Sequence, residues 1–312
     1  MDKLGGLFNP SSPEMEAIAG LTYYTIAISV VILGLIVAAI TYIVIAHRKK
    51  PGDNEEPYQN FGNLSLEIVW TLIPCAIVAV LFLLTCNTMR KVDPPVGDRE
   101  PDLIIIGHQW WWELRYPKSG VITANELHIP VGEYMLARIE SVDVIHDFWV
   151  PELGRKIDAV PGHPNHMWIV AGEPGVYLGA CAEFCGMQHA NMRIRVVAES
   201  EEEYKKWEKE QLVIPRTPRY GPAGKGAKLF QEKACMNCHT ILGTAAAARV
   251  GPNLTHLVDR QTIGAGVLIN TPENLTKWLT NPQKYKQGSL MPNMKLTESE
   301  VNDIVAYLEA LK

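Results

Sequence analysis

The chain has 312 residues, of which 20% are charged, and its 29 Lys and Arg against 34 Asp and Glu give a formal net charge of −5. This acidic balance argues against a general nucleic-acid binder, which is usually basic. The length leaves room for about two globular domains of roughly 100–200 residues each.

The amino-terminal part of the chain is predicted to form a transmembrane helical hairpin over residues 21–91. Residues 1–20 mix Pro, Ser, Gly and acidic residues and are expected to be a short exposed segment. Residues 21–46 carry no charge and are long enough to cross the hydrocarbon core, which takes about 20 apolar residues. Residues 68–89 form the second predicted span, and Pro74 is tolerated there because neighbouring helices re-satisfy its freed backbone group.

A basic run, His47-Arg48-Lys49-Lys50, follows the first span at once. Clustered Lys and Arg beside a span mark the cytoplasmic side. The amino terminus is therefore expected outside, and the second span returns the chain to the outside after about residue 92. The alternative, a buried helical hairpin of a soluble protein, is disfavoured by the charge-free length of both stretches.

Residues 92–211 change to short β-rich runs separated by turn signals such as Pro-Lys-Ser-Gly and Gly-Glu-Pro-Gly. Short strands at this spacing predict a β-sandwich or barrel. The charged run Glu201–Gln211 is expected to close this region as an amphipathic helix. The predicted strands are Asp102–Gly107, Glu133–Ser141, His166–Val170, Gly175–Ala180 and Asn191–Val197.

Residues 212–222 are rich in Pro and are predicted to be a linker. Residues 223–312 then have the pattern of a small, mostly helical domain. In its last predicted helix, Thr297 and Glu300 match a capping box. The predicted helices of this domain are Gly224–Lys233, Thr271–Thr280 and Thr297–Leu311.

The segment Cys235-Met236-Asn237-Cys238-His239 has the C-x-x-C-H spacing of c-type haem attachment. The thiols of Cys235 and Cys238 would form thioethers with the haem vinyl groups, and His239 would reach the iron from the adjacent position. The alternative is a redox dithiol, or a chance pair beside a surface His. The helical surroundings favour haem.

A haem used for electron transfer takes a second strong axial ligand, and a Met there raises the potential. Met291, in Leu290-Met291-Pro292, is the predicted ligand and Met294 is its rival. Either could instead be plain packing, because Met commonly fills gaps. Pro252 is expected to supply the carbonyl that fixes the His239 ring.

A second group of soft ligands lies at the end of the strand-rich region. A single blue-copper site takes one Cys, two His and a weak axial Met, whereas here two thiolates four residues apart could each bridge two copper ions. A disulfide or a zinc site is the alternative, and the thioether and the β-rich scaffold favour copper. The predicted ligands are His146, Cys181, Glu183 through its carbonyl, Cys185, His189 and Met192.

Residues 15–200 resemble subunit II of the haem–copper cytochrome c oxidases. The resemblance is carried by Glu67–Pro74, by Gly107–Trp112, by the motif around His146 and by the Cys181–Met192 segment. Residues 223–312 resemble a class I cytochrome c. The implied fold is a multi-domain membrane protein with a two-helix transmembrane hairpin, a cupredoxin-like β-sandwich and a small all-α cytochrome c domain.

The resemblance implies roles for further residues. Trp110 matches the exposed aromatic through which the family takes up electrons, and the tethered haem domain is expected to dock there. Glu67 matches a carboxylate near the mouth of a proton path, with helix capping as the alternative. Glu183 is expected to help hold a magnesium ion at the boundary with subunit I. The middle aromatic is often Tyr in the family and is Trp111 here, a change from which little consequence is expected.

The function implied is that of subunit II of a respiratory, proton-pumping cytochrome c oxidase in a bacterial-type cytoplasmic membrane. Its cofactors would be one covalent haem c, two copper ions and a magnesium ion. Its partners would be subunit I, other oxidase subunits and an extracytoplasmic donor, either a cytochrome c or a quinol-oxidising complex. Two alternatives stay open: the corresponding subunit of a copper-pair nitric oxide reductase, and a membrane-tethered redox sensor. A quinol oxidase is disfavoured by the complete set of copper ligands.

Overall fold

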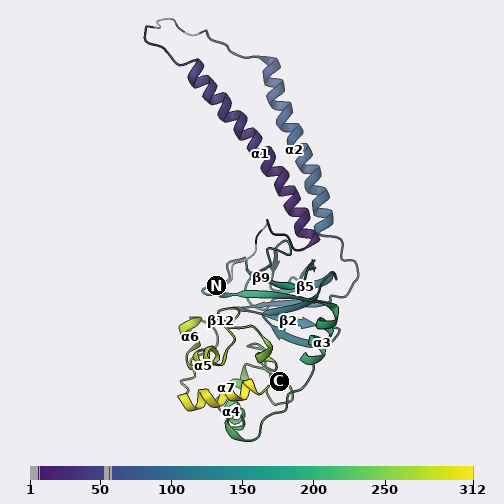
Figure 1. Cartoon of the computed structure of the whole chain (residues 1–312), viewed down its shortest axis with the longest axis vertical. Coiled ribbons are helices and arrows are strands. Elements are labelled where there is room, and N and C mark those ends of the chain that lie inside the picture. Colours follow the sequence, from purple (N-terminus) through teal and green to yellow (C-terminus); the bar gives the residue numbers. More distant parts are fainter. Residues whose placement is uncertain (1–5, 7, 53–55, 57, 312) are drawn as a thin grey trace. The chain divides into compact units, whose positions relative to one another are not determined.

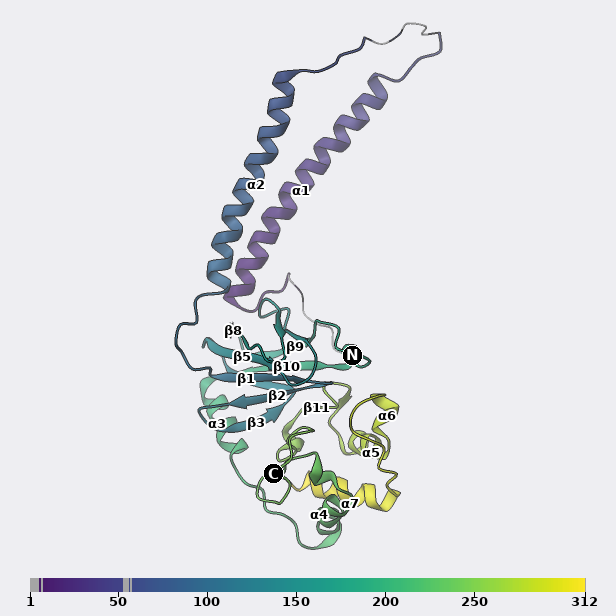
Figure 2. The same cartoon turned by 180° about the vertical axis from the view of Figure 1, so that it is seen from behind.

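The computed structural model describes residues 6, 8–52, 56 and 58–311. The chain divides into two compact units, of which one is Glu16–Pro94 and the other contains nearly all of the remaining residues. Figures 1 and 2 show the helix pair of the first unit and the sheets and short helices of the second.

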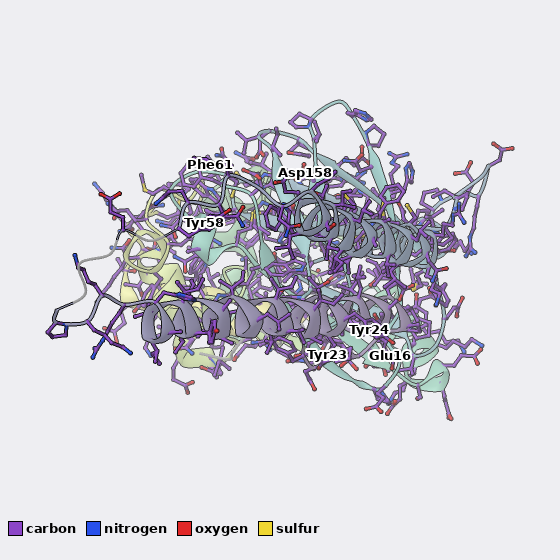
Figure 3. All side chains as sticks on the ribbon, turned by 90° about the horizontal axis from the view of Figure 1, so that it is seen from above. Glu16, Tyr23, Tyr24, Tyr58, Phe61 and Asp158 are labelled. Atoms are coloured by element: carbon purple, nitrogen blue, oxygen red, sulfur yellow. The ribbon has the colours of Figure 1, made fainter. Side chains whose placement is uncertain are left out.

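The first unit is built on two long apolar helices, α1 (Pro13–Ala46) and α2 (Leu64–Val92). Their most apolar windows have mean hydropathies of 2.9 and 2.6, so both helices are long and apolar enough to cross a membrane. Tyr23 and Tyr24 are exposed and lie near the Glu16 end of α1 (Figure 3), as expected of aromatic residues at a membrane interface. The prediction of two spans is confirmed.

The prediction that residues 1–20 are an exposed lead is wrong from Ser12 onward, whereas Gly6, Phe8 and Asn9 are exposed. Helix α1 begins at Pro13, because the Ser12 hydroxyl accepts a hydrogen bond from the Met15 amide (3.0 Å) and caps its first turn. Ser12, Glu14 and Met15 are all buried. Residues 1–5 and 7 lie outside the described part.

The start of α2 is capped from both sides. The Asn63 side chain accepts a hydrogen bond from the Leu66 amide, and Glu67 Oε1 accepts one from the Asn63 amide, both at 3.2 Å. Glu67 therefore serves as a helix cap, and its place on a proton path stays a prediction. Pro74 lies inside the helix, as expected.

Residues 102–211, here the β-domain, form two five-stranded sheets in a cupredoxin-like sandwich. The strand orders are β3-β2-β1-β5-β8 and β4-β10-β9-β6-β7. Strands β1 and β5 pair in parallel, as do β4 and β10. The strands are β1 (Leu103–His108), β2 (Trp111–Tyr116), β3 (Val121–Ala124), β4 (Glu126–Pro130), β5 (Met135–Ser141), β6 (His146–Trp149), β7 (Ile157–Ala159), β8 (Asn165–Ile169), β9 (Gly175–Cys181) and β10 (Arg193–Glu199).

The five strands predicted from the sequence are confirmed within two residues, but β2, β3, β4, β6 and β7 were not predicted. Strand β2 alternates apolar Trp112, Leu114 and Tyr116 with polar Glu113 and Arg115, so the strand signal was present there and was overlooked. Strand β4 (Glu-Leu-His-Ile-Pro) alternates in the same way. Strand β6 (His-Asp-Phe-Trp) has no such alternation in its four residues, so only the fold reveals it.

The core of the β-domain surrounds Trp112 and Phe148, which are almost completely buried and pack edge to face with their ring centroids 5.7 Å apart. Helix α3 (Glu201–Gln211) has the predicted bounds. Its Trp207 stacks on His128 of β4 at 4.2 Å, so this helix is fixed to the sandwich by an aromatic contact.

The β-domain is also bonded to residues that precede α1. The Ser11 amide donates to the Glu152 carbonyl at 2.9 Å, and the Ser11 carbonyl accepts from the Gly172 amide at 2.7 Å. The Ser12 hydroxyl donates to the Leu153 carbonyl at 2.6 Å. This short segment is therefore bonded to two loops of the β-domain.

Residues 221–311, here the C-terminal domain, are mostly helical as predicted. Helix α4 begins inside the predicted linker, because Pro222 is well placed in a first helical turn. The expected capping box of Thr297 and Glu300 is present. The elements are α4 (Gly221–Glu232), β11 (Thr262–Ile263), β12 (Leu268–Ile269), α5 (Pro272–Thr280), α6 (Pro282–Tyr285) and α7 (Glu298–Glu309).

Candidate metal and haem sites

Strand pairing brings the predicted copper ligands together. His146 begins β6 and Cys181 ends β9, and these strands pair antiparallel with Phe148 opposite Cys181. The loop after β9 carries Cys185, and a short 3₁₀ turn, His189–Asn191, places His189 beside it. Residues 35 apart in sequence thus meet at one end of the sandwich.

The donor atoms form one continuous cluster. The sulfurs of Cys181 and Cys185 are 3.7 Å apart, and both cysteines are free thiols. The nearest nitrogen of His146 lies 3.9 Å from the first sulfur, and that of His189 lies 3.7 Å from the second. Met192 Sδ is 3.9 Å from Cys185 Sγ. Two thiols, two imidazoles and a thioether suit soft metals, copper above all.

The carbonyl of Glu183 lies 3.2 Å from Cys181 Sγ, as expected of a backbone ligand. These six groups, from His146, Cys181, Glu183, Cys185, His189 and Met192, are called the ligand cluster below. The exposed Glu183 side chain makes no contact that assigns it a metal, so magnesium stays a prediction from the family resemblance alone.

The two thiols interact strongly. The hydrogen bond from Cys185 lowers the pKa of Cys181 to about 3 against the opposing effect of burial, and the same bond raises the pKa of Cys185. One member of the pair is therefore readily a thiolate, which is the form that binds metals.

Asp143, which sequence reasoning missed, orients the first imidazole. Its Oδ1 lies 2.8 Å from His146 Nε2, which leaves Nδ1 facing Cys181. Burial opposes protonation of His146, but Asp143 and Cys181 together raise its pKa. A carboxylate behind a metal-binding His is a common orienting device. The sequence signal was an acid three residues before the His, which is too common to be diagnostic.

Trp110 is connected directly to the ligand cluster. Its indole N–H donates to the Cys185 carbonyl at 2.9 Å, and the amide side chain of Gln109 donates to the same oxygen at 2.8 Å. The Gln109 backbone amide donates to Asp143 Oδ2 at 2.7 Å. The residue predicted to receive electrons is therefore one hydrogen bond from the ligand cluster.

The C-x-x-C-H segment lies between α4 and the core of the C-terminal domain. Cys235 begins a 3₁₀ turn, Cys235–Asn237. The thiols of Cys235 and Cys238 are both free, and both residues are partly buried. The Nδ1 atom of His239 lies 2.8 Å from the Pro252 carbonyl. Burial lowers the pKa of His239, so the imidazole is neutral, with Nε2 available to an iron. These residues fit a covalently bound haem.

The two candidate methionines have different surroundings. Met291 is partly buried against the core of the C-terminal domain, and its carbonyl accepts a hydrogen bond from Gln283 at 2.7 Å. Met294 is exposed. The packing therefore favours Met291 as the axial ligand, which stays a prediction.

A β-sandwich with a mixed sulfur and imidazole cluster, followed by a small helical domain with C-x-x-C-H, defines a cupredoxin-type copper protein joined to a c-type cytochrome. Three families match the chain: the cytochrome c oxidase subunit II transmembrane domain over residues 3–87, its periplasmic domain over residues 120–199, and cytochrome c over residues 223–312.

Curated relatives agree over almost the whole length. Cytochrome c oxidase subunit 2 of Alkalihalophilus pseudofirmus is 39% identical over 97% of this chain and 90% of that protein. The Bacillus subtilis protein of the same name is 33% identical, over 87% and 82% of the two chains. The crystal structure of the periplasmic domain of subunit II from Bradyrhizobium japonicum is 31% identical over 36% of this chain and 95% of that one, with a TM-score of 0.34.

The chain belongs to the cytochrome c oxidase subunit II family and carries a cytochrome c domain at its carboxyl end. It is thus a membrane-bound subunit of a haem–copper oxidase.

Proposed function

We propose that this chain takes up electrons at a haem c attached to Cys235 and Cys238 and passes them to a dinuclear copper centre in the ligand cluster. From there they leave for the oxygen-reducing haem–copper site of subunit I, in a complex that reduces oxygen to water and pumps protons. The Cys181 and Cys185 thiolates would hold both copper ions, and a pair that shared one electron would need little rearrangement when that electron moved on.

The single observation that carries this proposal is the ligand cluster. All six predicted groups converge, although His146 and the Cys181–Met192 segment lie on different strands. The Trp110 hydrogen bond to Cys185 gives the electron a short approach. The names of the curated relatives favour an oxygen-reducing partner over a nitric oxide reductase.

The topology that goes with this function has both termini and both redox domains outside a bacterial-type cytoplasmic membrane. Its support is the basic run after the first span, since Lys and Arg stay on the cytoplasmic side. We assign residues 21–91 to the membrane hairpin, 92–211 to the copper-pair domain and 223–312 to the haem domain.

Changing Cys185→Ser in the assembled oxidase tests the copper assignment. Ser cannot bridge two coppers, so the near-infrared absorption of the pair and the oxygen uptake should be lost, while the haem c spectrum remains. Cys86→Ser, in α2, is the matched control and should leave both signals in place. Near-infrared absorption retained in Cys185→Ser would contradict the assignment.

A further inference from the structure

We propose that two buried charges, Lys286 of the C-terminal domain and Glu126 of the β-domain, hold the C-terminal domain in a single position against the surface at Trp110. The inference rests on the proposed function, because it concerns how the electron reaches the ligand cluster. It assigns a positioning role to two residues that lie outside both redox sites.

Lys286 follows helix α6 and is 3% exposed. Its ammonium donates to the carbonyls of Trp110 and Asn191 in the β-domain, both at 2.7 Å, and to that of Gly264 in its own domain at 2.8 Å. An ammonium has three donors, so all of them are used. Burial lowers the pKa of Lys286 to about 7, so the ammonium form at this position depends on the hydrogen bonds that it donates. The side chain ties α6 to Trp110 and to the residue before Met192.

Glu126 makes the reverse contact from β4, and it is also almost fully buried. Its two oxygens accept hydrogen bonds from the amides of Gln261 and Thr262 in the C-terminal domain, each at 2.9 Å, and from the Thr262 hydroxyl at 3.1 Å. Burial lowers the pKa of the neighbouring Arg260 to about 10, and the Glu126 carboxylate acts in the opposite direction by favouring the charged guanidinium. The β11 end of the C-terminal domain is thereby fixed to the sandwich, where Figure 2 shows it beside the sheet.

The two contacts are reciprocal. Each domain contributes one buried charged side chain, and its backbone groups bind the charged side chain of the other domain. A buried charge without hydrogen-bonding partners is strongly unfavourable. Any shift of one domain along the other would separate Lys286 or Glu126 from carbonyls and amides that are rigidly placed. The pair therefore selects one docked position rather than a range of them.

The two domains also share a small apolar contact. Trp111 of β2 is buried in a cluster with Ala124 and with Ala265 of the C-terminal domain. The Gln188 side chain, from the loop of the ligand cluster, donates to the Gln287 carbonyl at 2.7 Å. The loop that precedes Met291 thus lies directly on the loop that carries His189.

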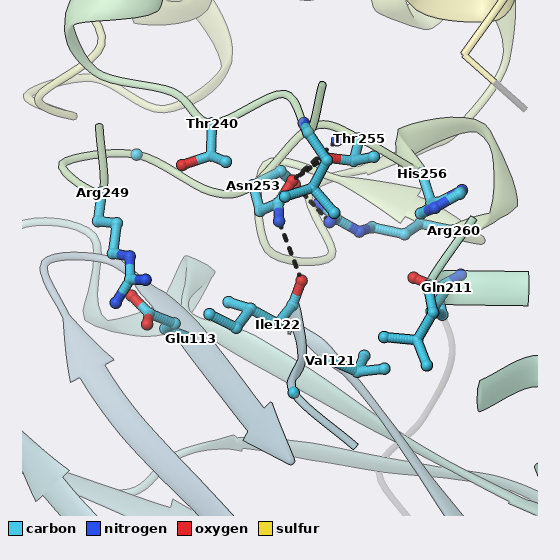
Figure 4. Close-up of a pocket in the computed structure, with 14 residues that line it drawn as sticks. Glu113, Val121, Ile122, Gln211, Thr240, Arg249, Asn253, Thr255, His256 and Arg260 are labelled. Atoms are coloured by element: carbon cyan, nitrogen blue, oxygen red, sulfur yellow. Dashed lines mark hydrogen bonds between the residues drawn. The ribbon is translucent and has the colours of Figure 1, made fainter. Parts of the chain in front are cut away.

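Another part of the seam is hollow. A cavity of about 100 Å³ lies between the domains. Figure 4 shows Ile122 on one side of it and Arg249 and Asn253 on the other. The Asn253 side chain reaches across it and donates to the Ile122 carbonyl at 3.2 Å. The lining mixes polar and apolar residues, and the hollow means that this region adds little packing between the domains.

The test measures internal electron transfer in the assembled oxidase. The haem is photoreduced, and its reoxidation by the copper pair is followed in Lys286→Met and Glu126→Gln. Losing either charge leaves buried hydrogen-bonding groups of the other domain without a partner, so docking should weaken about a hundredfold. The fast phase of haem reoxidation, which comes from docked molecules, should lose amplitude accordingly. The absorption of both centres should not change, because neither residue is a ligand.

Matched controls make the same substitutions at exposed positions: Lys284→Met in α6, and Glu133→Gln beside β5. Both should keep the fast phase within about twofold of the unchanged protein, as surface substitutions do. Fast phases of equal size in Lys286→Met and Lys284→Met, or in the two Glu variants, would overturn the inference and leave the proposed function standing. Absence of the copper signal or of any transfer in the unchanged oxidase would instead contradict the proposed function.

Discussion

His146 in the β-domain and His239 in the C-terminal domain are both pressed against a glycine. A Cβ on Gly107 would lie 2.6 Å from the His146 ring, and one on Gly251 would lie 2.6 Å from the His239 ring. Their hydrogen-bond partners differ, since the Asp143 carboxylate orients the first ring and the Pro252 carbonyl the second, each at 2.8 Å. The copper-side ring thus depends on a removable side chain, whereas the haem-side ring depends on backbone and packing.

The largest effect is expected from Gly251→Val, because packing is the main control on His239. Overpacking a tight contact costs about 1–3 kcal/mol, and occasionally more. We expect poor haem retention and a lower unfolding temperature of the C-terminal domain, with the copper spectrum unchanged. The control is Gly154→Val, at a glycine with open space around it. Normal haem content in Gly251→Val would show that the close approach does not matter.

The second prediction concerns the other axial position. Met291→Ala should remove the weak far-red band of Met–haem coordination and lower the haem potential, because the thioether ligand raises it. Met294→Ala, at an exposed position, should leave the band in place. The reverse pattern in absorption spectra would assign Met294 instead.

Asp143→Asn tests the removable partner on the copper side. Loss of an orienting carboxylate typically lowers metal affinity by about 10- to 100-fold. Copper content after dialysis against a chelator should fall, while the haem c spectrum stays the same. Asp98→Asn changes an exposed Asp of the same unit and should have no effect. Equal copper retention in the two variants would mean that packing against Gly107 is enough to orient His146.

The smallest effect is expected from Asp102, a carboxylate that serves only the scaffold. Burial would raise its pKa, but bonds from Lys118 and the Leu136 amide, with the charge of Arg99, hold the pKa below the usual 3.8. Its contribution to stability is therefore full above 3.8 and lost as the pH falls through the lowered value. Asp102→Asn should be less stable than the unchanged protein in urea at pH 6, by about 1 kcal/mol or less. The difference should shrink in stronger acid, and a constant difference would contradict the pKa shift.

The same comparison explains what could be predicted from the sequence. The haem motif is local, so Cys235–His239 was recognisable from spacing alone, and the spans followed from apolar length. The ligand cluster needed His146 to be matched with a distant segment, which chemistry and the family resemblance allowed.

Residues that act through tertiary placement could not be predicted. Asp143, Lys286 and Glu126 are ordinary charged residues until the fold brings a ring or a foreign backbone beside them. Strand β2, by contrast, carries the alternating pattern Trp112–Tyr116 and could have been predicted from it, although the buried contact of its Trp111 with Ala265 of the C-terminal domain could not. That contact also gives Trp111 surroundings that the sequence did not reveal.

The bonds of Ser11 and Ser12 to the β-domain bear on how a water-soluble fragment should be prepared. A fragment starting at Pro95, after the second membrane helix, would leave the Gly172 amide and the carbonyls of Glu152 and Leu153 without their partners. These groups lie in a turn and a bend of the β-domain, which would be held less firmly without them. Adding a short peptide that matches the segment around Ser11 should restore these hydrogen bonds and stabilise the fragment.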